Sequence, residues 1–161
     1  MLRDALIGLA AGAIGTVALN VSTYADMAIR GRASSGAPSK MVHILADKAH
    51  LPLSSKGVGA QDETAQNRES GLGALLGYVN GLGVGALYGL LRSQVDEDAS
   101  LPLMGVLVGA SAMAASDVPL VSLKVSNPKT WGVSGWASDA IPHLIYGLVT
   151  AGVYQLLADN E

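Results

Sequence analysis

Residues Gly71–Leu91 read GLGALLGYVNGLGVGALYGLL and carry the strongest structural signal in the chain. Five of these glycines are four residues apart, which places them on one slowly drifting face of an α-helix. Each glycine in a soluble helix costs about 1 kcal/mol relative to alanine. In a bilayer, small residues instead let a neighbouring helix approach closely. The stretch therefore predicts a membrane-spanning helix whose glycine zipper packs on another helix, through Gly73, Gly77, Gly81, Gly85 and Gly89.

The composition supports a membrane protein and excludes several other classes. Half of the 161 residues are hydrophobic and only 14% are charged, against about 25% charged in ordinary soluble domains. The net charge of −3 and the lack of a basic run argue against nucleic acid as a partner. There is no cysteine, which excludes disulfides and thiolate chemistry. We expect one membrane domain, residues 1–161, with the lipid bilayer as its first partner.

Three further apolar segments are long enough to cross the ~30 Å hydrocarbon core of a bilayer as helices. With residues 71–91 they predict an all-α, polytopic membrane four-helix bundle with glycine-rich seams. The first segment also has features of a signal peptide, but its apolar run is long and the arginines that follow it favour a retained span. The three segments are Ala5–Tyr24, Leu101–Leu123 and Ala137–Leu157.

The polar connection between the first two spans contains a short amphipathic pattern at about residues 39–50. This pattern predicts a helix that lies in the membrane interface or, equally well, one that caps the bundle. Residues 54–70 are typical of a flexible linker. In the third span, Pro119 is expected to kink the helix or end it early.

The distribution of lysine and arginine predicts the orientation. Eight of the ten basic residues lie between spans one and two or between spans three and four. The positive-inside rule then places both termini outside and both basic loops in the cytoplasm. These eight residues are Arg30, Arg32, Lys40, Lys48, Lys56, Arg68, Lys124 and Lys129.

The two halves of the chain resemble each other. Leu6–Ser22 aligns without gaps on Leu103–Pro119, which matches Gly8 with Gly105 and Gly12 with Gly109. Gly81–Leu91 aligns on Gly147–Leu157, which matches Gly81 with Gly147. Both units run in the same direction, so the pattern predicts a parallel two-helix repeat about an axis along the membrane normal.

Each glycine-bearing stripe also carries a polar residue, and helical rise places several of these at similar depth. The predicted intramembrane polar cluster consists of Asn20, Asn80, Asp117 and His143. These side chains are either interhelical hydrogen-bond links worth ~0.6 kcal/mol each or parts of a proton or cation path. Asp139, four residues before His143, is interpreted as a partner of the positive helix N-terminus. No metal or cofactor is predicted, because three histidines without cysteine form a weak metal signal.

The function predicted from these patterns is non-enzymatic. The motifs of serine hydrolases, zinc proteases and P-loop nucleotide-binding proteins are missing. The leading hypothesis is a structural or accessory membrane protein that self-associates or docks on a larger complex, with the glycine ladder of residues 73–89 as the interface. The alternative is a small proton or cation channel or transporter, as a dimer, that uses the intramembrane polar cluster. A third hypothesis is an interfacial enzyme that uses His43 and His50.

One segment supports a family-level expectation. TYADMAIRGRASS, from Thr23 to Ser35, follows a small-residue span that ends in TVALN, and GLGVGALYGLLR comes later in the chain. Together these segments resemble a group of small uncharacterised membrane proteins of high-GC actinobacteria. The resemblance implies a multi-span bacterial membrane protein and brings no activity, cofactor or catalytic residue with it.

Overall fold

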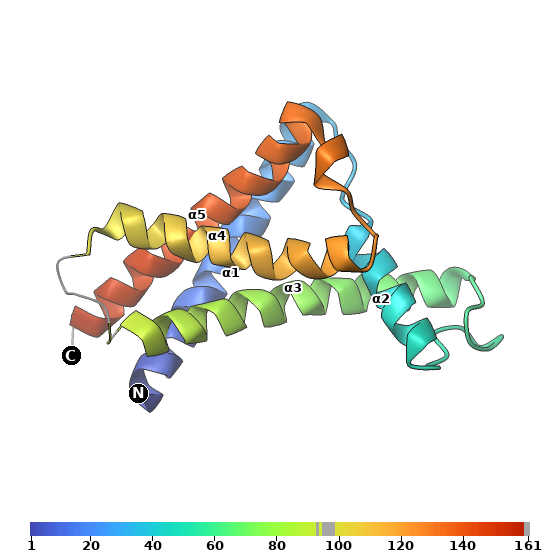
Figure 1. Cartoon of the computed structure of the whole chain (residues 1–161), viewed down its shortest axis with the longest axis horizontal. Coiled ribbons are helices and arrows are strands. Elements are labelled where there is room, and N and C mark those ends of the chain that lie inside the picture. The colour runs from blue at the N-terminus through green and yellow to red at the C-terminus, as the bar shows by residue number, and fades with distance from the viewer. Residues whose placement is uncertain (93, 95–98, 160–161) are drawn as a thin grey trace.

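The computed structural model describes residues 1–92, 94 and 99–159, and it is all-helical apart from turns and one isolated β-bridge (Figure 1). Four of its helices are long and apolar enough to cross a membrane, which confirms the prediction of a four-span helical protein at the level of length and composition. The helices are α1 (Leu2–Arg30), α2 (Ala37–Lys48), α3 (Glu63–Arg92), α4 (Leu101–Ser122), the 3-10 helix η1 (Pro128–Thr130) and α5 (Gly132–Asp159).

The start of α3 and the course of α4 at Pro119 differ from the sequence-based expectation, whereas the bounds of α4 agree with it to within one residue. The α3 helix begins at Glu63, so the second half of the expected linker is helical. The cause is a local cap, because the Asp62 carboxylate accepts the backbone N–H of Ala65 at 2.9 Å. In α4, Pro119 lies inside the helix, which continues to Ser122 rather than ending early. A proline near the C-terminal end removes only one helical hydrogen bond.

The long helices pack in two groups. Figure 1 shows α1 and α5 running beside each other and crossing α3 and α4. The α1 helix packs on α3 and α5, and α4 packs on α5, whereas the contact between α3 and α4 is much smaller. The start of α1 and the end of α5 lie at one end of the bundle (Figure 1). We call the other end, which carries the α1–α2–α3 connection and the α4–α5 loop, the basic end.

Glycine brings α1 and α3 into backbone contact. A methyl group on Gly12 would lie 2.6 Å from the carbonyl oxygen of Gly81 and 3.0 Å from the Cα of Gly85. A methyl group on Gly89 would lie 3.0 Å from the Cα of Gly8. Ordinary carbon–carbon contacts are about 3.5–4.0 Å. At these positions the two backbones therefore lie too close for any side chain.

The rest of the glycine ladder has other surroundings. A methyl group on Gly73 would lie 3.1 Å from the backbone of Pro38 in α2, while Gly77 has no neighbour within 4 Å. Gly77 is open because α1 turns away from α3 beyond Gly81 and follows α5 towards the basic end. Four of the five ladder glycines are thus covered by other helices of the same chain.

The pairing of α4 with α5 uses the same kind of contact. A methyl group on Gly109 would lie 2.5 Å from the carbonyl oxygen of His143 and 3.2 Å from the Cα of Leu144. A methyl group on Gly147 would lie 2.7 Å from the Cα of Gly109. The helices of each pair, α1 with α3 and α4 with α5, run antiparallel. Along each contact the residue numbers of one helix rise while those of the other fall.

Tyr146 joins three helices at the centre of the bundle. Its ring is 1% exposed, and its hydroxyl donates a 2.6 Å hydrogen bond to the carbonyl oxygen of Gly81 on α3. On α1, a methyl group at Gly15 would lie 3.0 Å from the same ring and would collide with the hydroxyl of Thr150. The absence of side chains at Gly15 and Gly81 therefore creates the space that Tyr146 of α5 fills.

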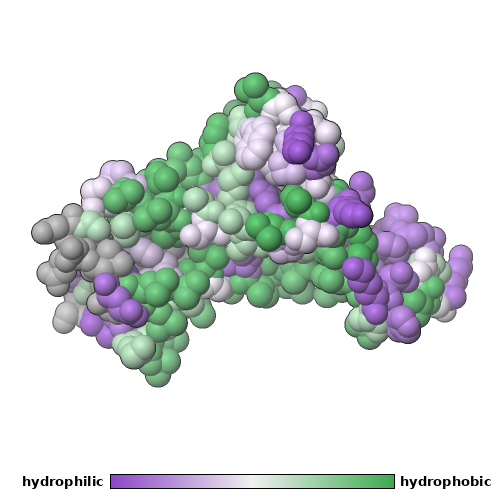
Figure 2. Space-filling view, viewed as in Figure 1, coloured by the Kyte–Doolittle hydropathy of each residue, from purple (hydrophilic) through white to green (hydrophobic). Residues whose placement is uncertain are grey.

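The surface separates into apolar flanks and polar ends. Figure 2 shows hydrophobic residues along the spanning helices and hydrophilic residues gathered around α2 and at the turn that leads into α5. Large side chains on these flanks are exposed, including Leu75 (60%), Val79 (65%) and Leu103 (52%). An apolar belt between polar ends is the pattern expected of a protein in a bilayer.

Candidate functional site

A polar group forms between α4 and α5, about one to three helical turns from the basic end. His143 Nδ1 lies 2.8 Å from the backbone carbonyl oxygen of Asp139 and 3.4 Å from its carboxylate. Since a carbonyl oxygen only accepts, Nδ1 carries a proton. Nε2 of the same ring lies 3.5 Å from the hydroxyl oxygen of Ser116 on α4. That hydroxyl already donates to the carbonyl oxygen of Met113 at 2.9 Å, so it has no second proton to donate to Nε2.

Two carboxyl groups complete this arrangement. The carboxyl groups of Asp117 on α4 and Asp139 on α5 are near enough for their charges to influence each other. The Oδ2 atom of Asp139 is buried and has no hydrogen-bond partner in the part of the chain that the structure describes. Two deprotonated carboxylates offer only acceptors, so they cannot bond to each other. We call Ser116, Asp117, Asp139 and His143 the acidic cluster.

Prolines supply further acceptors beside the acidic cluster. Pro119 follows Asp117 closely in α4, and Pro142 directly precedes His143 in α5. A proline lacks an N–H, so the carbonyl group four residues earlier loses its usual helical partner. The carbonyl oxygens concerned are those of Ala115 and Ser138. Both therefore lack the N–H partner that a carbonyl group usually has inside a helix.

The structure brings together only part of the polar cluster predicted from the sequence. Asp117 and His143 belong to the same group, as their depths suggested. Asn80 instead donates a 3.1 Å hydrogen bond to the carbonyl oxygen of Ala112 and so links α3 to α4. Among the described residues, half-buried Asn20 on α1 forms no hydrogen bond with Asn80, Asp117 or His143.

The sequence also placed Asp139 wrongly. It was expected at the N-terminus of its helix, but α5 begins at Gly132, so Asp139 lies about two turns inside. The effect of a helix dipole falls off within the first turn, which leaves that role without a basis. The i, i+4 spacing of Asp139 and His143 is visible in the sequence, and the two side chains do lie 3.4 Å apart.

Comparison with known proteins gives no assignment. No family model matches the chain, and neither a curated protein nor a solved structure is similar to it. Function is therefore inferred from the geometry of the chain itself, and the acidic cluster is one part of it. This cluster combines an imidazole, a hydroxyl and two neighbouring carboxyl groups, all of which can hold or exchange a proton.

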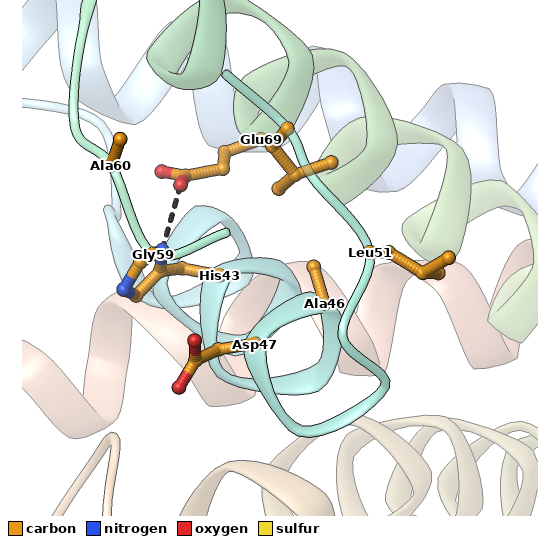
Figure 3. Close-up of a pocket in the computed structure, with 8 residues that line it drawn as sticks. His43, Ala46, Asp47, Leu51, Gly59, Ala60 and Glu69 are labelled. Atoms are coloured by element: carbon orange, nitrogen blue, oxygen red, sulfur yellow. Dashed lines mark hydrogen bonds and ion pairs between the residues drawn. The ribbon is translucent and has the colours of Figure 1, made fainter. Parts of the chain in front are cut away.

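A second polar group lies outside the spans, where α2 packs on the first turns of α3. Figure 3 shows the Glu69 side chain turned towards His43, with Gly59 and Ala60 beside them. The His43 Nδ1–Glu69 Oε1 distance is 3.0 Å, and Gln61 donates to the same carboxylate at 2.9 Å. Glu69 is 6% exposed. These contacts place α2 against the bundle, one of the two positions that the sequence allowed.

The α2–α3 group does not form a metal site. Throughout the described ranges, no three histidine or acidic side chains converge as metal ligands. Its hydrogen bonds instead fix the connection between the helices. Asp62 accepts from Ser54 and from the start of α3, which holds the pKa of its carboxyl below the usual value of 3.8.

The basic end carries an anchor between α1 and α5. Arg30 donates to the hydroxyl of Ser134 at 2.8 Å and also to that of Ser138, while its ion pair with Asp26 spans 2.5 Å. Near it, the rings of Trp131 and Trp136 lie 5.1 Å apart. Arginine and tryptophan together are typical of the lipid headgroup region.

Proposed function

We propose that this chain is an integral membrane protein with a structural or accessory role rather than an enzymatic one, placed in a bacterial plasma membrane with both termini outside. In this proposal, glycine seams close the bundle internally and the outer surface docks on a second copy. The apolar flanks and the four spanning helices support it. The glycine ladder of α3, which the sequence suggested as the interface, is not proposed here. Its residues Gly81, Gly85 and Gly89 are already covered by α1.

The internal repeat is part of this proposal, with one change of register. A methyl group on Gly85 would meet the carbonyl of Gly8 and the backbone of Gly12. A methyl group on Gly147 would meet the two residues that align with these in the second half of the chain. The counterpart of Gly147 in the first hairpin is therefore Gly85, one helical turn beyond the Gly81 given by the sequence alignment. We infer that the bundle consists of two related antiparallel hairpins.

The outer face of α4 offers the docking surface. Because α4 packs mainly on α5, its opposite face is exposed along its whole length. At mid-helix this face carries only small residues in two four-residue steps, Ala110 with Ala114 and Ser111 with Ala115. Small residues at this spacing let two membrane helices approach closely. A second copy presenting the same face would cover both surfaces.

Cysteine cross-linking tests this interface directly, because the natural chain has no cysteine. Ala114→Cys places one thiol on the outer face of α4, and Val17→Cys places one on the exposed side of α1 as a matched control. Oxidation in liposomes at low protein density is expected to give a covalent dimer for Ala114→Cys and monomer for Val17→Cys. Equal cross-linking of the two variants, or none, would contradict the proposal.

A second candidate function is a small proton or cation channel or transporter that works as a dimer. It is favoured by the acidic cluster, since ionisable side chains inside a membrane usually have a partner or a function. Liposomes with the wild type should then show flux above background, and Asp117→Asn should lower it. Flux at background level for both proteins would remove this candidate.

A further inference from the structure

We propose that the basic end of the bundle binds the headgroups of anionic phospholipids, with α2 lying in the headgroup layer of the bilayer. The inference rests on the membrane placement proposed above and adds the class of lipid that the protein selects. The partner is the surrounding bilayer itself, rather than free phosphate or an acidic protein.

Every lysine of the chain lies at the basic end, and each is exposed. None of them forms an ion pair within the part of the chain that the structure describes. The nearby Arg30 and Arg32 differ, because both bind the Asp26 carboxylate. Five ammonium groups are thus left for an anionic ligand. They belong to Lys40 and Lys48 on α2, Lys56 in the loop that follows it, and Lys124 and Lys129 between α4 and α5.

The two ends of the bundle carry opposite charge. Residues 26–70 and 123–131, at the basic end, hold eight basic and five acidic residues. The sequence that joins α3 to α4 at the opposite end, residues 92–100, holds three acidic residues and one arginine. Basic segments beside a membrane are attracted to anionic lipids over roughly one Debye length. An anionic headgroup is therefore attracted to one end of the bundle.

The outer side of α2 has the pattern of a helix at a membrane surface. Its buried stripe consists of Val42 and Ala46, and the helix packs mainly on α3. Met41 and Leu45 each precede a residue of this stripe, which turns them roughly 100° away from it, and Leu45 is 44% exposed. Lys48 follows Leu45 by three residues and so lies on the same side. A lysine stem can cover such apolar side chains while the ammonium stays at the phosphates.

Apolar side chains are also exposed in the turn that leads into α5. Val133 is 88% exposed and Trp136 is 45% exposed, and the ring of Trp136 lies 5.1 Å from that of Trp131. Tryptophan is enriched where membrane and water meet. Figure 1 shows α2 beside the end of α4 that leads into this turn. The lysines of α2 and of the α4–α5 loop therefore belong to one surface.

Quenching by brominated lipids tests the selectivity, because both tryptophans of the chain lie at the basic end. The wild type is reconstituted into equimolar phosphatidylcholine and phosphatidylglycerol, with one lipid or the other brominated in its acyl chains. We expect an exchange constant in favour of phosphatidylglycerol on the order of 5, the effect of one lysine near an anionic surface. It should fall as salt is added. Equal quenching by the two lipids at low salt would overturn the proposal and leave the lysines to an acidic protein.

Replacing all five lysines tests whether their charge is responsible. Glutamine at the five positions should bring the exchange constant towards 1, whereas arginine, the matched control, should preserve it because its charge is permanent. Selectivity that survives in the glutamine variant, or that is lost in the arginine variant, would contradict binding by charge. Circular dichroism checks the fold of both, and the wild-type salt series stands without them.

A fluorescent label tests the position of α2. A nitrobenzoxadiazole group on Leu45→Cys should emit at shorter wavelength in vesicles that contain phosphatidylglycerol and should be quenched by brominated lipid. The matched control is Asp47→Cys, which is also exposed but lies roughly 200° further round the helix. The same emission from both positions would refute the placement of α2 in the headgroup layer.

These outcomes separate the inference from the function on which it rests. If no brominated lipid quenches the tryptophans, the chain is not in the bilayer and the membrane proposal fails as well. If both lipids quench equally, only the lipid selectivity fails. The α4 interface is tested apart from both, because cross-linking of Ala114→Cys does not depend on lipid charge.

Discussion

The glycine contact between α1 and α3 makes a quantitative prediction for Gly85→Ala. The added methyl group would lie 2.6 Å from the Cα of Gly12, about 1 Å inside ordinary contact distance. Overpacking of this kind costs about 1–3 kcal/mol. The gain in helix propensity from glycine to alanine is at most about 1 kcal/mol and works in the opposite direction. We expect a net destabilisation of about 0–2 kcal/mol.

Gly77→Ala is the matched control, because the same change is made on the same helix where no atom lies within 4 Å. The propensity gain is common to both variants and cancels when they are compared. Gly85→Ala should therefore be about 1–3 kcal/mol less stable than Gly77→Ala. The measurement is reversible unfolding in mixed micelles of mild detergent and sodium dodecyl sulfate, followed by circular dichroism. Equal stability of the two variants would refute close backbone packing between α1 and α3.

Three further changes test other contacts. Tyr146→Phe removes the hydroxyl that bonds to Gly81 and should cost about 0.5–1.5 kcal/mol of unfolding free energy in the same assay, with no change of the helical spectrum. The Asp62 carboxylate, whose pKa is held below 3.8 by its bonds to Ser54 and to the start of α3, should stabilise the α2–α3 connection above that pH. The stabilisation should disappear as the pH falls through the lowered pKa, and hydrogen exchange of α2 should show this loss in the wild type but not in Asp62→Asn. Arg30→Gln breaks an exposed anchor and should change stability by less than about 1 kcal/mol, so a larger loss would show that the anchor organises α1 and α5.

The fold class could be predicted because its signals are local. Four apolar segments and a four-residue glycine spacing are visible without any knowledge of neighbours, and the structure has four helices of that kind. Helix ends were predicted less well because capping decides them. The start of α3 depends on the Asp62 cap, and the start of α5 at Gly132 follows the 3-10 turn η1.

The candidate site was only partly predictable because depth along a helix does not determine the direction of a side chain. Asn20 and Asp117 were expected at one depth, yet of these two residues only Asp117 is a neighbour of Asp139 in the part of the chain that the structure describes. Tyr146 gave no sequence signal, since its importance depends on the space left by two glycines on other helices. A contact that depends on three helices can be recognised only when the way in which the helices cross is known.

The length of α3 has a mechanical consequence. Its 30 residues extend ~45 Å, whereas the hydrocarbon layer needs ~30 Å, so in a bilayer roughly two to three turns would project into water at the end that carries α2. The helix contains no proline that could act as a joint. The α2 helix is tied to the projecting end through the His43–Glu69 contact, and the same helix carries, further along, the Gly81 carbonyl that accepts the Tyr146 hydroxyl. A displacement of α2 would therefore be felt first by a helix that also contacts the centre of the bundle.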